Sequence, residues 1–314
     1  MKLSIVTTLY NSSEYIEAFY NRMTHSARKI TEDYEIIFVN DGSKDDSLEK
    51  AAAVFQKDNK VKIIDLSRNF GHHRAIMTGL SYAQGEYVFL IDADLEEEPE
   101  LLEDFRHELE KAQGVDVIYG VQEKRKGGLF EKFSGWFFYK FFNLISDHNI
   151  PKNLSLIRLM TRRYVSALIE FKEVHPVFAG LCELAGFKQQ AYFFKKKHKK
   201  RSEYTLKRKI ALFINSITSF SAKPLIFIFY LGLFILLGTM VMGSIVVLRK
   251  LIHGIAVSGW ASTILSIWFF GGLLTFCVGV IGVYLEKVFV QSKNRPYSIT
   301  RKVYDREKKE TVTK

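Results

Sequence analysis

Two aspartates one residue apart, Asp92 and Asp94, directly follow a short apolar run that ends at Ile91. Carboxylate oxygens are the hard ligands that Mg²⁺ and Mn²⁺ prefer, and a cation bound in this way can also hold a diphosphate. Glu96 comes two residues later and adds negative charge that favours a cation. We therefore expect a site for Mg²⁺ or Mn²⁺ formed by Asp92, Asp94 and Glu96.

The acidic run continues with Glu97, Glu98 and Glu100, for which we expect a different role. Pro99 and Glu100 have the composition of a helix start, and a helix is expected from Glu100 to Lys111. Acidic side chains are favourable in the first turn of a helix because they face its positive end. We expect these three glutamates to be solvated residues of a loop and a helix start.

Polar residues also follow three other apolar runs. They are Thr8, Tyr10 and Asn11 after the first run, Asp41 after the second and Arg68 after the third. Asp41 could accept hydrogen bonds from a base or a ribose hydroxyl, although its Asn-Asp-Gly-Ser sequence is also an ordinary turn. The Arg-Asn-Phe-Gly-His sequence at Arg68 is consistent with diphosphate contact. His72 and His73 follow, and we expect both to be structural.

The elements that must position these residues alternate along the first 92 residues. Apolar runs predict strands at 3–10, 34–39, 61–66 and 87–91, and apolar spacing predicts helices at 15–30, 46–57 and 73–83. This alternation predicts an α/β fold with a doubly wound, mainly parallel, Rossmann-like sheet. Ligands of such sheets bind at the carboxyl ends of the strands, where the polar residues above are found.

Two charge-free stretches, Leu225–Leu248 and Trp260–Leu285, are each long enough to cross a membrane as a helix. Basic residues lie on their outer sides, whereas the loop that joins them carries only Arg249 and Lys250. The positive-inside rule then predicts a multi-pass membrane protein, with a two-helix hairpin and both termini in the cytosol.

The formal net charge of +11 is concentrated near this hairpin. Residues 1–194 hold 24 basic and 29 acidic side chains, whereas residues 195–314 hold 21 basic and 5 acidic ones. A polybasic segment beside a hairpin is typical of contact with anionic membrane lipids, and no basic stripe elsewhere supports nucleic-acid binding. Two cysteines exclude a disulfide framework.

These observations divide the chain into four regions. They are an α/β domain at 1–125, a membrane-interface region at 126–223, two transmembrane helices within 224–286 (about 225–248 and 260–285), and a cytosolic basic tail at 287–314. The second region contains a dense aromatic run at 136–145, which predicts an amphipathic helix lying in the bilayer interface. A soluble core helix is the alternative there.

Taken together, the four strand ends resemble the family 2 glycosyltransferases of the GT-A fold. The branch in question, which includes dolichyl-phosphate mannose synthase and bactoprenol glucosyl transferase, loads a sugar onto polyprenyl phosphate. The matching sequences are Tyr10-Asn11, Asp41-Gly42-Ser43, Arg68-Asn69-x-Gly71-His72 and Asp92-x-Asp94-Leu95, with the apolar hairpin behind them. The resemblance implies an inverting transfer from a nucleotide-diphosphate sugar, with a UDP-sugar favoured, to polyprenyl (undecaprenyl) phosphate for cell-envelope glycan or lipid modification.

The resemblance also implies roles for individual residues. Thr8, Tyr10, Asn11, Asp41, Arg68 and Asp92 would bind the nucleotide sugar, with Asp41 on the base. Asp94 and Arg158 are the catalytic candidates. The acceptor phosphate would contact Arg158, Arg201 and Tyr204, and the segment from Gly120 to Arg158 would wrap the acceptor.

The chain departs from the family pattern where that pattern reads Gly-Asp-Phe-Arg-Leu, because here it reads Ser155-Leu156-Ile157-Arg158-Leu159. Leu156 thus occupies the position at which the family has its acidic residue. Thr8 occupies a position at which the family usually has proline. A lipid phosphate is already largely a dianion at cytosolic pH, so it needs little proton removal. We therefore expect an enzyme.

Two other functions are left open by the sequence. A non-catalytic membrane subunit would bind a nucleotide sugar without turnover, and Leu156 is the residue that favours it. A polysaccharide synthase is the other, but the chain lacks its Gln-x-x-Arg-Trp sequence and its additional spans. The sugar and the oligomeric state, a homo-oligomer included, are open as well.

Overall fold

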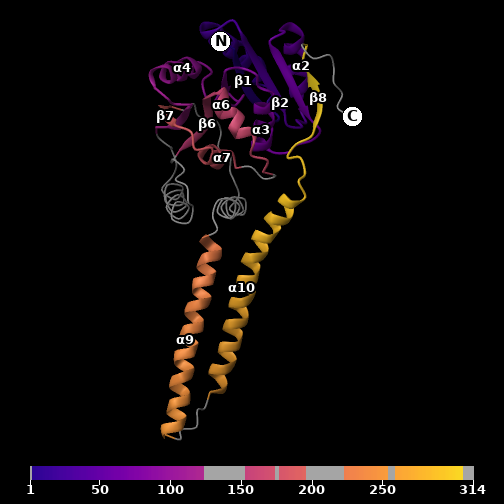
Figure 1. Cartoon of the computed structure of the whole chain (residues 1–314). Helices are drawn as coiled ribbons and strands as arrows, with labels where there is room; N and C mark the ends of the chain where they lie inside the picture. The colour runs from indigo at the N-terminus through magenta and orange to yellow at the C-terminus, as the bar shows by residue number, and fades with distance from the viewer. Residues whose placement is uncertain (1, 124–152, 174–176, 196–222, 254–258, 307–314) are drawn as a thin grey trace. The chain divides into compact units, whose positions relative to one another are not determined.

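The computed structural model of the chain describes residues 2–123, 153–173, 177–195, 223–253 and 259–306 (Figure 1). The chain divides into two compact units. The first comprises Met1–Gly135, His148–Glu203 and Arg295–Lys314, and the second comprises Trp136–Asp147 and Tyr204–Asn294.

The first unit contains alternating strands and helices. They are β1 (Leu3–Leu9), α1 (Ile16–Ile30), β2 (Tyr34–Asn40), α2 (Ser47–Lys57), β3 (Val61–Leu66), α3 (His72–Tyr82), β4 (Tyr87–Leu90), α4 (Leu101–Lys111), β5 (Val117–Gln122), β6 (Leu154–Thr161), α6 (Arg162–Ile169), α7 (Phe178–Leu184), β7 (Gln189–Phe194) and β8 (Thr300–Tyr304). The predicted elements of the first 92 residues are all present, with ends shifted by at most one residue. The predicted helix at 100–111 is α4.

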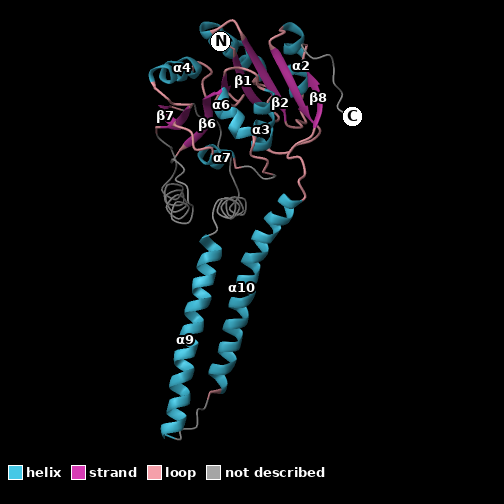
Figure 2. Ribbon diagram, viewed as in Figure 1, coloured by secondary structure: helices cyan, strands magenta, loops and turns pink. Residues whose placement is uncertain are grey.

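These described strands form an eight-stranded mixed sheet in the order β7-β5-β6-β4-β1-β2-β3-β8. Figure 2 shows the strands in magenta, with helices beside them. β1 pairs in parallel with β2 and β4, and β2 pairs in parallel with β3. β6 is antiparallel to β4, and β8 is antiparallel to β3. The predicted α/β fold class is confirmed, and the carboxyl ends of β1 to β4 lie along one edge of the sheet.

Helices cover both faces of this sheet because consecutive strand residues point to opposite sides. On one face, Ile5 and Phe38 lie in a core with residues of α1, α2 and α4. On the other face, Val6 and Val39 lie in a core with residues of α3, α6 and α7. A fully buried phenylalanine such as Phe38 contributes roughly 1.5–3 kcal/mol to stability.

The helix α3 lies unusually close to the sheet because it carries glycine at the point of contact. A Cβ atom on Gly79 would lie 2.5 Å from Cγ1 of Val6 and 2.8 Å from Cγ2 of Val39. Any larger residue would force α3 away from β1 and β2. This close approach positions the first residue of α3, His72, at the ends of the central strands.

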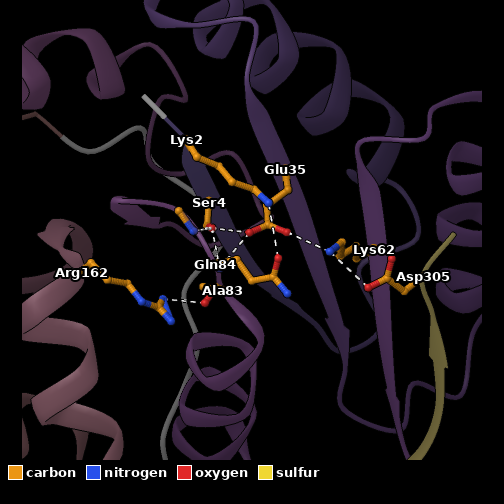
Figure 3. Close-up of polar contacts among 9 residues, drawn as sticks. Lys2, Ser4, Glu35, Lys62, Ala83, Gln84, Arg162 and Asp305 are labelled. Carbon is orange, nitrogen blue, oxygen red and sulfur yellow. Dashed lines mark hydrogen bonds and ion pairs between the residues drawn. The ribbon is translucent and has the colours of Figure 1, made fainter. Parts of the chain in front are cut away.

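The C-terminal tail returns to the sheet as the edge strand β8, which was not among the predicted elements. A buried ion cluster holds the end of this strand (Figure 3). The Nζ of Lys62 lies 3.2 Å from Oε2 of Glu35 and 3.1 Å from Oδ2 of Asp305. Glu35 also accepts a 2.5 Å hydrogen bond from the hydroxyl of Ser4. Part of the predicted cytosolic tail therefore belongs to the folded first unit.

The second unit contains two long helices, α9 (Lys223–His253) and α10 (Trp260–Ser292), which contact one another. Of the residues that the structure describes, one stretch, Ser266–Ser292, is long and apolar enough to cross a membrane, with a mean hydropathy of 2.0. The apolar stretch found in α9, Leu225–Ile235, is shorter. The two-span hairpin and its orientation stay predictions. The aromatic run at 136–145 lies outside the described residues.

Candidate functional site

Asp41 organises the edge of the sheet at which the strands end. It follows β2, is 2% exposed, and accepts hydrogen bonds from the backbone N–H groups of Phe70 at 2.7 Å and Gly71 at 3.0 Å. Burial raises the pKa of Asp41, whereas these two N–H donors oppose the rise. The carboxylate therefore fixes the loop between β3 and α3, and its predicted contact with a base stays a prediction.

The turn after Asp41 depends on Gly42. Gly42 has a φ of +63°, a backbone conformation that residues with a Cβ atom rarely adopt. A Cβ atom there would also lie 2.4 Å from the backbone nitrogen of Asn69. The loops after β2 and β3 thus touch through their backbones, which brings Asp41 and Arg68 to the same part of the edge.

Asn11, at the end of β1, is bonded to the loop after β2. Its backbone N–H donates to Oγ of Ser43 at 3.2 Å, and its side-chain Oδ1 accepts from the N–H of Lys44 at 2.9 Å. The residue has a φ of 52°, a left-handed conformation that asparagine tolerates better than most residues. The predicted site residues Asn11 and Asp41 are therefore brought together. Tyr10 beside them is 48% exposed.

Arg68 projects from the loop after β3 and is exposed. Its guanidinium lies over the ring of Phe70 at 4.1 Å and donates to the carbonyl of Asn69 at 3.0 Å. Arg68 is held by its own loop and faces solvent, which is compatible with the predicted diphosphate contact.

Asp92 and Asp94 follow β4, as predicted, and both are partly exposed. The backbone N–H of Glu96 donates to Oδ1 of Asp94 at 3.1 Å, which fixes that carboxylate. Within the described part of the chain, no group of three or more histidine, cysteine or acidic side chains is arranged to hold a metal. Two accessible carboxylates nevertheless fit Mg²⁺ or Mn²⁺, because such ions commonly take one or two carboxylates with substrate phosphates and water.

His72, which we expected to be structural, lies at this site. Its Nδ1 lies 3.0 Å from Oγ1 of Thr8, and its Nε2 lies 3.4 Å from Oδ1 of Asp92. Partial desolvation of the ring by the surrounding protein lowers the pKa of His72, and the negative charges of Asp41 and Asp94 oppose this shift. The signal that could have revealed it is its place directly after the Gly71 turn, where a strand-end loop meets a helix start.

The burial of Glu97 corrects an expectation drawn from the sequence. We expected a solvated side chain, but Glu97 is 1% exposed, and its Oε1 accepts a hydrogen bond from the hydroxyl of Ser155. By contrast, Glu100 forms an ion pair with Arg22 at 2.5 Å, and its side chain is 42% exposed. The acidic run therefore contains one buried carboxylate, beside the segment that carries Leu156.

Arg158, the other catalytic candidate, is 1% exposed. Its guanidinium lies 5.2 Å from the ring of Phe178 and 5.9 Å from that of Tyr119. This position does not present the guanidinium to solvent, so its contact with the acceptor phosphate stays a prediction. Arg201 and Tyr204, also predicted for the acceptor, lie outside the described residues.

Comparison with known proteins agrees with this geometry. Residues 4–169 match the Glycosyl transferase family 2 pattern, a range that includes the carboxyl ends of β1 to β4. The uncharacterized glycosyltransferase YkcC of Bacillus subtilis is 38% identical, covering 98% of this chain and 96% of its own. The SfII prophage-derived bactoprenol glucosyl transferase of Shigella flexneri is 32% identical, covering 96% of this chain and 98% of its own.

A solved structure has the same fold. Glucosyl-3-phosphoglycerate synthase from Mycobacterium tuberculosis, determined with Mn²⁺, uridine diphosphate and phosphoglyceric acid, superposes with a TM-score of 0.51. It is 18% identical, and the match covers 69% of this chain and 76% of that one. From the family match, the full-length relatives and the fold together, we conclude that the chain belongs to glycosyl transferase family 2 and is a glycosyltransferase.

Proposed function

We propose that this glycosyltransferase moves a sugar from a nucleotide-diphosphate sugar, with UDP as the favoured nucleotide, to polyprenyl phosphate. The observation that carries the proposal is the shared edge of the sheet, where the Asp92 and Asp94 carboxylates follow β4 beside the loop that Asp41 holds. Support for the acceptor comes from the bactoprenol glucosyl transferase of Shigella flexneri, which aligns with nearly the whole chain.

Asp92 and Asp94 would hold the divalent metal, with Glu96 beside them. The M. tuberculosis synthase, whose structure was determined with Mn²⁺ and uridine diphosphate, supports a divalent metal in the reaction. When bound, the metal offsets the negative charge of the diphosphate and so makes it a better leaving group. The loop at Arg68 and the turns at Asn11 and Asp41 would fix the nucleotide, so that the anomeric carbon is aligned for attack.

The transfer forms one bond and breaks one bond. An oxygen of the lipid phosphate attacks C1 of the sugar, and the bond between C1 and the diphosphate oxygen breaks. The nucleoside diphosphate leaves with the bonding electron pair, and the configuration at C1 inverts. Because the phosphate dianion has no proton to lose, Leu156 in place of an acidic residue is compatible with this reaction.

Arg158 is proposed to meet the lipid phosphate. Its Nε has no hydrogen-bond partner within the part of the chain that the structure describes. An unsatisfied buried donor is costly, and an anion would satisfy it. We propose Arg201 and Tyr204 for the same acceptor from the sequence alone.

The proposed location is the plasma membrane, with the catalytic unit in the cytosol. The apolar stretch Ser266–Ser292 supports membrane attachment. A second crossing by α9 follows from the charge-free stretch Leu225–Leu248, and the orientation follows from the basic residues outside the two stretches. Anionic lipids are the expected neighbours of the polybasic segment at 195–201.

The proposal is tested with the full chain purified in detergent. It is incubated with Mg²⁺ or Mn²⁺, polyprenyl phosphate and a panel of labelled nucleotide sugars, and label is measured in the organic phase. We expect one nucleotide sugar to give a lipid-extractable product. Binding of a nucleotide sugar without any product would favour the non-catalytic subunit, and absence of both would reject the proposal.

A further inference from the structure

The imidazole of His72 connects the ends of two strands. His72 is the first residue of α3, and its two ring nitrogens face different partners: Nδ1 lies 3.0 Å from Oγ1 of Thr8 at the end of β1, and Nε2 lies 3.4 Å from Oδ1 of Asp92 after β4. The side chain of His72 is 41% exposed and that of Asp92 is 26% exposed. The ring thus lies at the open edge of the sheet, against a carboxylate that we propose as a metal ligand.

The chemistry of the partners fixes the direction of these contacts. A carboxylate oxygen can only accept, so the ring is favourably oriented when Nε2 carries its proton toward Asp92. Nδ1 then has a lone pair, and the hydroxyl of Thr8 can donate to it. Two contacts at opposite ends of the ring restrict its rotation.

The start of α3 is itself fixed, which makes the position of His72 well defined. Gly71 precedes it with a φ of 101°, and the N–H of Gly71 donates to Asp41 at 3.0 Å. Gly79 lets the same helix lie directly on β1 and β2. His73, whose ring centroid lies 6.0 Å from that of His72, belongs to the same helix start and provides a matched neighbour for comparison.

We propose that His72 is a positioning residue that orients the carboxylate of Asp92 for the metal and the diphosphate. The inference rests on the proposed function, since it assigns a role within the same site. Partners that hydrogen-bond a metal ligand set its orientation, and losing one typically costs about 10–100-fold in metal affinity or activity. Thr8 contributes by holding the far side of the ring.

Mn²⁺ binding, followed by electron paramagnetic resonance of the free ion, tests the role without any turnover. The full chain in detergent is titrated with Mn²⁺ at saturating UDP, as wild type, His72→Ala, His72→Gln and His73→Ala. We expect His72→Ala to weaken Mn²⁺ binding about 10–100-fold. His72→Gln should recover most of the affinity, because its amide N–H can reach Asp92 in place of Nε2. His73→Ala should stay close to wild type.

Several outcomes would overturn the inference. They are wild-type affinity in His72→Ala, an equal loss in His73→Ala, or a loss in His72→Gln as large as in His72→Ala when the melting temperature of the glutamine variant is unchanged. If the wild-type chain itself binds no Mn²⁺ with UDP present, the proposed metal site fails, and the inference fails with it. If the wild type binds and His72→Ala binds equally well, only the inference fails.

Discussion

The carboxylate of Asp41 accepts a 2.7 Å hydrogen bond from the backbone N–H of Phe70, and this bond joins the turn after β2 to the turn after β3. Its second oxygen accepts from Gly71, so that one buried side chain fixes the loop that carries Arg68 and the residue that begins α3. Asp41 therefore acts on the site through the loop it holds.

Replacing Asp41 with asparagine should weaken UDP binding. The amide oxygen of asparagine can still accept a hydrogen bond from one of the two backbone N–H groups. The amide NH₂ group would then face the other N–H group, and two donors cannot form a hydrogen bond with each other. A lost hydrogen bond to a charged group costs about 1.5–3 kcal/mol, which corresponds to roughly 10–100-fold in affinity if the loop is displaced. Isothermal titration of UDP in the presence of Mn²⁺ measures the effect. Asp46→Asn, on an exposed side chain nearby, is the control and should bind as wild type does. Equal affinity in both variants would contradict this role of Asp41.

Asp94→Ala should abolish metal-dependent transfer. Removing a direct ligand is expected to cost more than removing a partner of a ligand, so the loss should exceed about 100-fold. Transfer and Mn²⁺ binding are measured on the same preparation. Asp104→Ala, on the exposed face of α4, is the matched control, and its loss of the 3.1 Å contact with Tyr192 should leave both quantities unchanged. Retained transfer in Asp94→Ala would show that this carboxylate is not required.

Lys62→Met should destabilise the first unit and loosen β8. The change leaves Glu35 and Asp305 as buried carboxylates without their shared cation, which should cost about 3–5 kcal/mol. Chemical unfolding at neutral pH measures it. Lys60→Met is the control, since its partner Glu32 has a side chain that is 77% exposed, and a surface pair contributes at most about 1 kcal/mol. Similar losses in the two variants would mean that the cluster adds nothing beyond a surface pair.

The same cluster predicts a pH dependence. Burial lowers the pKa of Lys62, but the charges of Glu35 and Asp305 outweigh it, so that the pKa lies above its ordinary value of 10.5. Its stabilising contribution is therefore complete below pH 10.5 and is lost as the pH rises through the higher folded-state pKa. The stability difference between wild type and Lys62→Met should be constant from pH 7 to 9 and should shrink above 10.5. A difference that shrinks already below pH 9 would argue against this assignment.

Arg158→Met separates a packing role from a role in acceptor binding. Replacing a buried cation by an apolar residue of similar length is often neutral or stabilising. The free energy of unfolding should therefore change by less than about 2 kcal/mol. UDP binding should also be unchanged, whereas transfer should fall more than tenfold through a higher KM for polyprenyl phosphate. The three measurements use one purified variant. Unchanged transfer would remove Arg158 from the acceptor site.

The sequence predicted the elements of the first 92 residues because their apolar periodicity is strong and each strand ends in polar residues. It did not reveal β8, because the five residues Thr300–Tyr304 include two basic side chains and their pairing partner β3 lies far away along the chain. A short edge strand of this kind is determined by tertiary pairing, not by local pattern.

The site was predictable in its residue types and less so in its contacts. The place of Asp92 and Asp94 after β4 was predicted because an apolar strand that ends in carboxylates is recognisable in a sequence. The contact of His72 with Asp92 depends on how closely α3 lies on β1, which Gly79 permits and no local spacing reveals. The burial of Glu97 depends on its contact with Ser155 in β6, a strand that pairs with β4 in antiparallel orientation.

The most direct test of the central claim compares three acceptors in one assay: polyprenyl phosphate, polyprenol without a phosphate, and water. Nucleoside diphosphate release and label in the organic phase are measured together for the wild-type chain with its preferred nucleotide sugar. We predict one lipid-linked sugar per nucleoside diphosphate released with polyprenyl phosphate, and no lipid product with polyprenol. Nucleoside diphosphate release without a lipid product, or equal transfer to polyprenol, would contradict the account.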